Sequence, residues 1–535
     1  MDAVTLTAVA VAIAAQLYIS PIPEVSTIKV LLTYFSANTV LFLCLFATAS
    51  QILGSISRLT FLNVIFLSTA TTLTLIRRLY FSPLSSFPGP KLAALSNLYK
   101  ANIYRTGTGG KALLELHEKY NSDIVRVGPN EVSIRSVDAV DKIFKGKYPR
   151  GTFYEVGAIN GAYNLNTQRN YEVHTPWRRI WEKAFGSAEF KDYNPRVELH
   201  VSKFIEVIRK TEGEEVNVTK LLENLVFDIM ADLSFGHDAG MQDGKGDNEY
   251  MDFVHKYMAA VGVIAALRPL CQLLPLLPET SDVRDFRLRG EALLAKRQKL
   301  GTSRKDIFRH LLYPDPVTNA TFTQTDLNSN ANLVIVAGSD TTTTTLTQIF
   351  RMLAIETRVL KKLQEEIDVV CGEGKELNIQ TTTKMSYLNA VINEGLRLCN
   401  PLPTGSYAGT YPQGVEVAGK FIPGNVQVMV PHLALMTDER YFSKGWEFIP
   451  ERWTEEWSDG VKERKAFIPF GYGAHSCVGK QLALNEMRPT IARLVREFDI
   501  VLGDSYDEKI WVEEWKDHAV LQVGKLWVHF AKRTR

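Results

Sequence analysis

The sequence predicts a mainly α-helical protein with small β-sheets behind an N-terminal transmembrane anchor. Three observations predict this class: the first 80 residues carry little charge, apolar residues recur at helical spacing along much of the remaining chain, and strand-like runs are few and short. The helical patterns are clearest over residues 111–120, 177–184, 197–210, 218–233, 327–354, 358–370, 388–398 and 479–497. The strand-like runs cover residues 124–127, 131–134, 415–417, 426–430 and 526–530.

The anchor is predicted from three runs without any charged residue, at residues 3–23, 30–57 and 59–76. A membrane-spanning helix needs about 20 largely apolar residues, so residues 1–80 hold one to three transmembrane segments. A cleaved signal peptide is the alternative for the first run, but that run lacks a basic start and further apolar runs follow it. Arg77 and Arg78 come directly after the third run, and basic residues stay on the cytoplasmic side of a membrane. We therefore expect the remainder of the chain to be cytoplasmic.

Residues 81–92 form a proline-rich hinge after the anchor, with prolines at positions 83, 88 and 90. Proline fixes φ and lacks a backbone donor, so the third apolar helix cannot continue through this stretch. No repeat or long linker follows it, which predicts one large, mainly helical domain over residues 93–535.

Composition excludes several classes of function. Lys plus Arg number 61 and Asp plus Glu number 59, a net charge of +2, which argues against a dedicated nucleic-acid binder. The five cysteines are scattered, odd in number and without a CxxC pair, so a disulfide scaffold or zinc ribbon is not expected. A reducing compartment fits this cysteine usage.

The strongest candidate for chemistry is a glycine-rich loop at residues 470–479, which contains Cys477 and leads directly into a helical pattern. A cysteine just before a helix N-terminus meets free N–H groups and the positive end of the helix dipole. Both favour the thiolate, the form of cysteine that binds metal. A buried, inert cysteine is the plain alternative, and the spacing matches neither a dinucleotide fingerprint nor a P-loop.

Two further patterns precede this loop. Glu394 and Arg397 share one face of a predicted helix, which allows an ion pair, and a Pro-Glu-Arg-Trp run containing Arg452 follows them. Residues 337–342 place a glycine and a threonine run inside a long apolar helix. Both features disfavour a regular helix, and such local inconsistency often marks a working site. Taken alone, these patterns also fit a surface ion pair and a polar helix face.

In this order, with Glu394 and Cys477 lying 83 positions apart, the patterns resemble those of the cytochrome P-450 family, over residues 85–535. The resemblance implies a haem b cofactor whose iron is ligated by the Cys477 thiolate. It also implies that Phe470 shields the sulfur, that Gly473 and Gly479 let the backbone approach the haem, and that His475 contacts a propionate. His174 and Arg178, four residues apart, fit a helix that binds propionate.

The same resemblance assigns roles to the other two patterns. Ala337 and Gly338 would leave room for dioxygen, while Asp340 and Thr341 would relay protons to it. Glu394, Arg397 and Arg452 would form a structural lock. One departure is that no arginine follows Pro403 until Arg440, whereas relatives often carry an arginine several residues after this proline. One usual propionate partner is therefore missing from the sequence pattern.

The implied function is that of a haem-thiolate monooxygenase, which inserts one oxygen atom from O2 into a lipophilic small molecule. Resemblance to fungal microsomal members favours secondary metabolism, with a terpenoid or aromatic substrate and a location in the endoplasmic reticulum membrane. NADPH–cytochrome reductase is the expected electron donor, with cytochrome b5 as a second candidate. The expected pocket walls are residues 152–166, the helix before Asp340, and residues 402–406 and 519–521. A haem-thiolate isomerase or dehydratase, a non-enzymatic membrane protein and a membrane-anchored hydrolase remain as alternatives.

Overall fold

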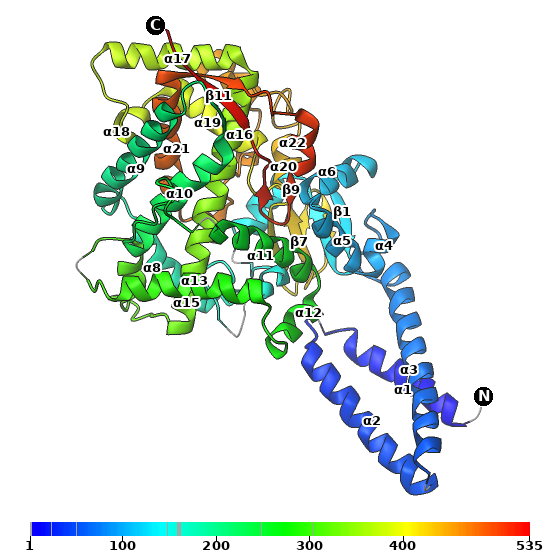
Figure 1. The fold of residues 1–535 in the computed structure, drawn as a ribbon. Coiled ribbons are helices and arrows are strands. Elements are labelled where there is room, and N and C mark those ends of the chain that lie inside the picture. The colour runs from blue at the N-terminus through cyan, green and yellow to red at the C-terminus, as the bar shows by residue number, and fades with distance from the viewer. Residues whose placement is uncertain are drawn as a thin grey trace.

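The computed structural model describes residues 3–534 except residues 23, 50, 147, 158–161, 248 and 303. Three helices, α1 (Ala3–Ile19), α2 (Thr27–Ala49) and α3 (Ile52–Tyr80), extend away from a large helical body (Figure 1). Of these, α2 and α3 are long and apolar enough to cross a membrane, whereas α1 is shorter. The predicted class, a mainly helical protein with small sheets behind an N-terminal anchor, is confirmed.

The break between α2 and α3 differs from the one that the charge pattern predicts. The uncharged runs separate at Arg58, but the structure breaks the helices before Ile52 and places Arg58 inside α3. One charged side chain does not end a helix, because the backbone hydrogen bonds continue past it. The two helices are joined by side-chain contacts in which Tyr34 and Asn38 of α2 each hydrogen-bond Asn63 of α3, both at 2.5 Å. Such polar pairs stabilise helix association inside a bilayer.

Eleven longer helices form most of the body. They are α6 (Gly109–Lys119), α8 (Tyr171–Ala184), α9 (Phe190–Lys210), α10 (Val218–Phe235), α11 (Glu249–Ala266), α13 (Ser281–Gln298), α15 (Gln324–Ile335), α16 (Thr341–Ile355), α17 (Thr357–Gly372), α19 (Ser386–Leu398) and α21 (Lys480–Glu497). The shorter helices are α4 (Lys91–Leu95), α5 (Leu98–Thr106), α7 (Val137–Ala139), α12 (Arg268–Leu273), α14 (Ile307–Leu311), α18 (Ile379–Thr382), α20 (His432–Met436) and α22 (Glu508–Glu514), together with the single-turn segment η2 (Thr152–Gly157).

The helix predicted over residues 327–354 is interrupted at its centre. A π-helical segment, η5 (Val336–Asp340), separates α15 from α16, so the turn widens where Ala337 and Gly338 lie. Thr342 to Thr345 are buried in the first turns of α16. The local sequence therefore favours a distorted helix here, and π-helical turns occur frequently at functional sites.

Small sheets lie at the sides of the helical body. The largest has the strand order β1 (Ile124–Gly128), β2 (Glu131–Ile134), β7 (Gln427–Val430) and β4 (Ser406–Gly409), in which only the β2–β7 pair is parallel. A second sheet joins β3 (Glu215–Asn217), β11 (Trp527–Lys532) and β8 (Phe498–Leu502). Two antiparallel pairs complete the described strands: β5 (Val415–Val417) with β6 (Lys420–Ile422), and β9 (Lys516–Asp517) with β10 (Leu521–Gln522).

The turn between α1 and α2 is attached to the body by an ion-pair network. Glu24 in this turn accepts hydrogen bonds from Arg169, at 2.6 Å, and from Arg268 of α12, at 3.3 Å. The same two arginines also pair with Glu155 of η2, which Arg268 contacts at 3.0 Å. Two carboxylates and two guanidinium groups therefore join the anchor to the segments η2 and α12 of the body.

Candidate active site

A cavity of about 530 Å³ lies between the π-helical segment η5, helices α8 and α16, and the loop that leads into α21. Most of the predicted site residues line it: His174, Arg178, Ala337, Gly338, Thr341, Phe470, His475, Cys477 and Gly479. The predicted walls line it as well, with residues drawn from 152–157, 162–166, 402–406 and 519–520. Residues 158–161 of the first wall lie outside the described part of the chain.

Cys477 lies three residues before Lys480, the first residue of α21, and its side chain is exposed on the cavity wall. Its backbone N–H donates to the carbonyl oxygen of Phe470 at 2.7 Å, which closes the loop. Burial of the thiol by the surrounding protein raises its pKa, while the backbone N–H groups of Gly479 and Lys480 act to lower it. A thiol directed into a cavity at a helix N-terminus suits a soft metal ligand.

Gly473 has a different environment from the one expected. It is not among the residues that line the cavity, whereas Gly471 and Gly479 are. Its φ is +70°, and a Cβ at this position would lie 1.8 Å from the carbonyl oxygen of Phe144. The backbone of Gly473 therefore packs against the Phe144 segment, and glycine is required by that contact and by the left-handed conformation.

Four basic side chains converge on one wall of the cavity. His475 Nδ1 lies 3.2 Å from His174 Nε2 and 3.2 Å from Arg150 Nε, and Arg178 donates to the carbonyl oxygen of Ser476. Burial, reinforced by the nearby arginines, lowers the pKa of His174 to about 4 and that of His475 to about 2. Guanidinium groups beside histidines whose protonation they oppose provide a site for an anion, because an anion would relieve the repulsion.

Arg150 was missed by sequence reasoning. It lies in a Tyr-Pro-Arg-Gly turn with no motif around it, and it forms an isolated antiparallel bridge with Ala408 of β4. This strand belongs to the stretch after Pro403 in which the expected arginine is absent. The structure thus brings a guanidinium to this stretch from a segment about 250 positions earlier in the chain, a contact that only the tertiary fold creates.

Two other buried polar groups line the cavity and also escaped the sequence analysis. The indole N–H of Trp181 has no hydrogen-bond partner among the described residues. Glu486 of α21 is fully enclosed, and burial raises its pKa to about 8, although a hydrogen bond with Thr342 acts in the opposite direction. Both lie in amphipathic helical patterns without a motif around them, so nothing in the sequence singled them out.

The π-helical segment divides the predicted proton-relay pair. The Thr341 hydroxyl donates to the carbonyl oxygen of Ala337 at 2.8 Å, and Thr341 lines the cavity. Asp340 is buried and is not among the cavity-lining residues; its Oδ1 lies 3.1 Å from His255 Nε2. Consecutive residues on a helix point in different directions, so the hydroxyl and the carboxylate lie on different sides of this segment.

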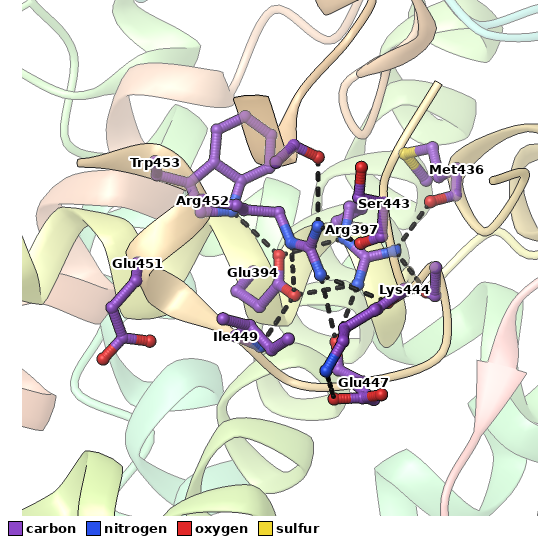
Figure 2. A network of polar contacts seen from close by, with 12 residues as sticks. Glu394, Arg397, Met436, Ser443, Lys444, Glu447, Ile449, Glu451, Arg452 and Trp453 are labelled. Carbon is purple, nitrogen blue, oxygen red and sulfur yellow. Dashed lines mark hydrogen bonds and ion pairs between the residues drawn. The ribbon is translucent and has the colours of Figure 1, made fainter. Parts of the chain in front are cut away.

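The structure brings Glu394, Arg397 and Arg452 together in a fully buried network, which Figure 2 shows from close by. Arg397 donates to both carboxylate oxygens of Glu394, at 2.9 and 2.8 Å, and Arg452 donates to Oε1 at 2.9 Å. The remaining guanidinium donors bond to backbone carbonyl oxygens, including those of Met436 and Ser443. Buried charges of this kind are tolerated because every partner is satisfied.

Trp453 extends this network toward the cysteine loop. Its indole N–H donates to Glu394 Oε2 at 2.9 Å, and its ring packs against Phe467 with 4.4 Å between ring centroids. Phe467 lies three residues before Phe470, at the start of the loop that contains Cys477. Trp453 therefore connects the buried network to the segment that leads into the cysteine loop. This tryptophan is not part of the Glu-x-x-Arg pattern.

The donor set fits a haem, although most of these contacts are individually ordinary. A thiol, an anion-binding wall of basic side chains and an unpartnered indole N–H line one cavity with mostly apolar walls. A soft metal would take the thiolate, and carboxylate substituents would take the basic wall.

Comparison with known proteins agrees with this arrangement. The sequence matches the family model for cytochrome P450 over residues 97–523. Cytochrome P450 monooxygenase FCK2 of Fusarium pseudograminearum is 31% identical over 468 residues, which cover 86% of this chain and 84% of that protein. Tryprostatin B 6-hydroxylase of Aspergillus fumigatus is 31% identical over 466 residues, which cover 86% and 82% of the two chains.

The fold is similar to that in a crystal structure of the cytochrome P450DA heme domain. The TM-score is 0.71, the sequence identity is 17%, and the likeness covers 84% of this chain and 98% of that chain. At this level of identity the likeness concerns the fold alone.

Proposed function

Since this chain belongs to the cytochrome P450 family and is a P450-type monooxygenase, we propose that Cys477 supplies the thiolate that ligates its haem, and that the haem is of the b type. The observation that carries this assignment is the Cys477 side chain, exposed on the wall of the cavity at the N-terminus of α21. When bound, thiolate-ligated haem supplies the activation of dioxygen, because the sulfur favours cleavage of the O–O bond.

The basic wall binds the propionates in this proposal. Arg150, His174, Arg178 and His475 would hold the two carboxylates, with Trp181 Nε1 as an additional donor. Charge-assisted hydrogen bonds from guanidinium groups are the strongest available to a carboxylate, so the wall also fixes the orientation of the cofactor.

Thr341 and Asp340 would manage protons at the wall of the cavity formed by η5 and α16. The Thr341 hydroxyl lies at the cavity wall, next to the small residues Ala337 and Gly338 of η5. Asp340 holds a carboxylate one residue earlier, away from the cavity. In this division of work, Ala337 and Gly338 leave space for dioxygen, Thr341 orients the proton that is delivered, and Asp340 stores it.

We assign a lipophilic small molecule of secondary metabolism, terpenoid or aromatic, as the substrate. Apolar side chains line much of the cavity, among them Phe153, Leu165, Val261 and Leu333. Apolar walls exclude water and orient a substrate by shape. The fungal relatives include a protein named tryprostatin B 6-hydroxylase, which supports a small-molecule substrate.

The remaining assignments concern electron supply and location. The redox partner is NADPH–cytochrome reductase, with cytochrome b5 as a second donor, in the endoplasmic reticulum membrane. Residues 1–80 serve as the anchor, residues 81–92 as the hinge and residues 93–535 as the cytoplasmic catalytic domain. Arg77 and Arg78 in the last turn of α3 support the cytoplasmic orientation.

The decisive experiment is a carbon monoxide difference spectrum of the reduced, purified full-length protein. A strongly red-shifted Soret band is expected from thiolate-ligated haem. Folded protein that was supplied with haem but shows no such band would overturn the proposal.

A further inference from the structure

His255 of α11 forms a hydrogen-bonded pair with Asp340 of η5, although the two residues are 85 positions apart. His255 Nε2 lies 3.1 Å from Asp340 Oδ1. The Asp340 side chain is 5% exposed, whereas the His255 side chain is 32% exposed. Since neither residue is among those that line the cavity, the imidazole connects a buried carboxylate with solvent on the side away from the cavity.

The second oxygen of the carboxylate, Asp340 Oδ2, is buried and has no hydrogen-bond partner among the described residues. Among the described residues, His255 is therefore the hydrogen-bond partner of Oδ1, and no hydrogen bond competes for Oδ2.

The surroundings of His255 favour the imidazolium. Burial acts to lower its pKa, but the hydrogen bond to Asp340 and the charges of Asp340, Glu223 and Asp252 outweigh burial, so the pKa is raised. These carboxylates come from η5, α10 and α11. The backbone carbonyl oxygen of His255 accepts a hydrogen bond from Gln522 at 3.1 Å, which ties this part of α11 to β10.

We propose that His255 is the positioning residue through which Asp340 receives protons from solvent. The proposal rests on the proposed monooxygenase site, because it concerns proton supply to the Asp340–Thr341 pair. In the transfer step, the Nε2–H bond of the imidazolium breaks and an O–H bond forms on the carboxylate of Asp340. Both groups become neutral, and Nε2 is then the nitrogen without a hydrogen. Once the carboxyl group of Asp340 has passed its proton on, the ring turns Nε2 toward solvent, takes the next proton there from water and returns to the pair.

The first test measures the pair itself and requires no turnover. Each histidine is titrated by the pH dependence of its modification with diethyl pyrocarbonate, read by peptide mass spectrometry on the full-length ferric protein. We expect His255 to titrate above the ordinary value of 6.5 and its midpoint to fall by about one pH unit or more in Asp340→Asn. A His255 that titrates at or below 6.5 and is unaffected by Asp340→Asn would overturn the proposal.

The second test measures proton supply in the protein reconstituted with NADPH–cytochrome reductase in phosphatidylcholine vesicles, without added substrate. His255→Gln keeps a hydrogen-bond donor but cannot titrate. We expect it to slow NADPH oxidation about 10²-fold and to raise the share of electrons released as hydrogen peroxide. The wild-type rate should fall as pH rises through the raised pKa of His255, because the imidazolium is lost there.

His310→Gln provides the matched control. His310 also faces a carboxylate, with its Nε2 3.5 Å from Glu189, but it lies on α14 and does not line the cavity. His255→Gln should add nothing to the effect of Asp340→Asn, since the imidazole acts through that carboxylate. Rates and peroxide shares equal to those of His310→Gln, or additive effects, would contradict the proposal. The carbon monoxide band is recorded for every variant, so that failure of the haem site is distinguished from failure of the relay.

Discussion

Arg150 and His475, which are 325 positions apart, contact each other at 3.2 Å between Nε and Nδ1. This contact joins the edge of the main sheet, where Arg150 bridges Ala408, to the loop that contains Cys477. It also gives the basic wall a second guanidinium beside that of Arg178. The arginine that the sequence pattern lacks after Pro403 is therefore replaced in space by one from another segment.

Removal of this guanidinium is predicted to weaken haem retention. We expect Arg150→Gln to speed transfer of haem to apomyoglobin about tenfold, which corresponds to about 1.4 kcal/mol. Arg440→Gln is the control. Arg440 is the first arginine after Pro403 in the sequence, but it pairs with Asp123 and Asp438 at the surface. Equal transfer rates for the two variants would remove Arg150 from the propionate site.

Cys477→Ser is predicted to abolish the red-shifted Soret band of the reduced carbon monoxide complex. A serine hydroxyl is not a soft ligand and remains protonated at neutral pH, so the electronic push of sulfur is lost. Cys371→Ser, on the partly exposed helix α17, should leave the band unchanged. An unchanged spectrum in Cys477→Ser would refute the ligand assignment.

Thr341→Ala is predicted to retain haem but to divert electrons to hydrogen peroxide. The alanine removes the hydroxyl that lines the cavity and donates to Ala337, while the helix remains intact. Loss of one positioned proton donor costs about 10²-fold or more in rate. Thr341→Ser restores a hydroxyl and should recover most of the coupling, measured as the ratio of peroxide released to NADPH consumed. Tightly coupled turnover in Thr341→Ala would exclude this residue from proton delivery.

Arg452→Ala is predicted to reduce the yield of folded holoprotein without altering which substrates bind. It leaves Glu394 and several carbonyl oxygens buried with one partner fewer, a change that costs about 3–5 kcal/mol. Arg358→Ala removes a nearby, largely exposed partner of Glu451 and should cost less than about 1 kcal/mol. Urea-dependent loss of the Soret band measures both, and equal midpoints would contradict a structural role for Arg452.

Much of the fold could be predicted from patterns between residues that are close in the sequence. The anchor, most of the long helices and the loop before α21 follow from charge-free runs, helical periodicity and glycine spacing, all of which are short-range signals. Helix α11 escaped because Ala259, Ala260 and Gly262 blur its apolar stripe. The glycine and the threonine run indicated an irregular helix near residues 337–342, but not the π-helical form of Val336–Asp340, which packs against α10.

The site was predictable where its residues belong to a motif. Cys477 and His475 lie in one loop, and Glu394 and Arg397 lie on one helix. Arg452 lies in the Pro-Glu-Arg-Trp run, which let its contact with Glu394 be expected across 58 positions. Trp453 adjoins Arg452, but its own hydrogen bond to Glu394 was not expected. Arg150 and His255 lie outside any motif and reach the site through contacts between residues 325 and 85 positions apart, for which a single sequence holds no signal.

The ion-paired turn at Glu24 has a practical consequence for recombinant work. Shortening the chain to start near residue 81 is an obvious way to obtain a detergent-free enzyme, yet it also deletes the carboxylate that bridges Arg169 and Arg268. Glu155 would then be the one carboxylate of this network left to pair with both guanidinium groups. Glu155 lies in η2, and its neighbours in that segment line the cavity. A shortened enzyme should therefore differ from the native one in ligand affinity as well as in solubility, and affinities measured on it should not be transferred to the full-length protein.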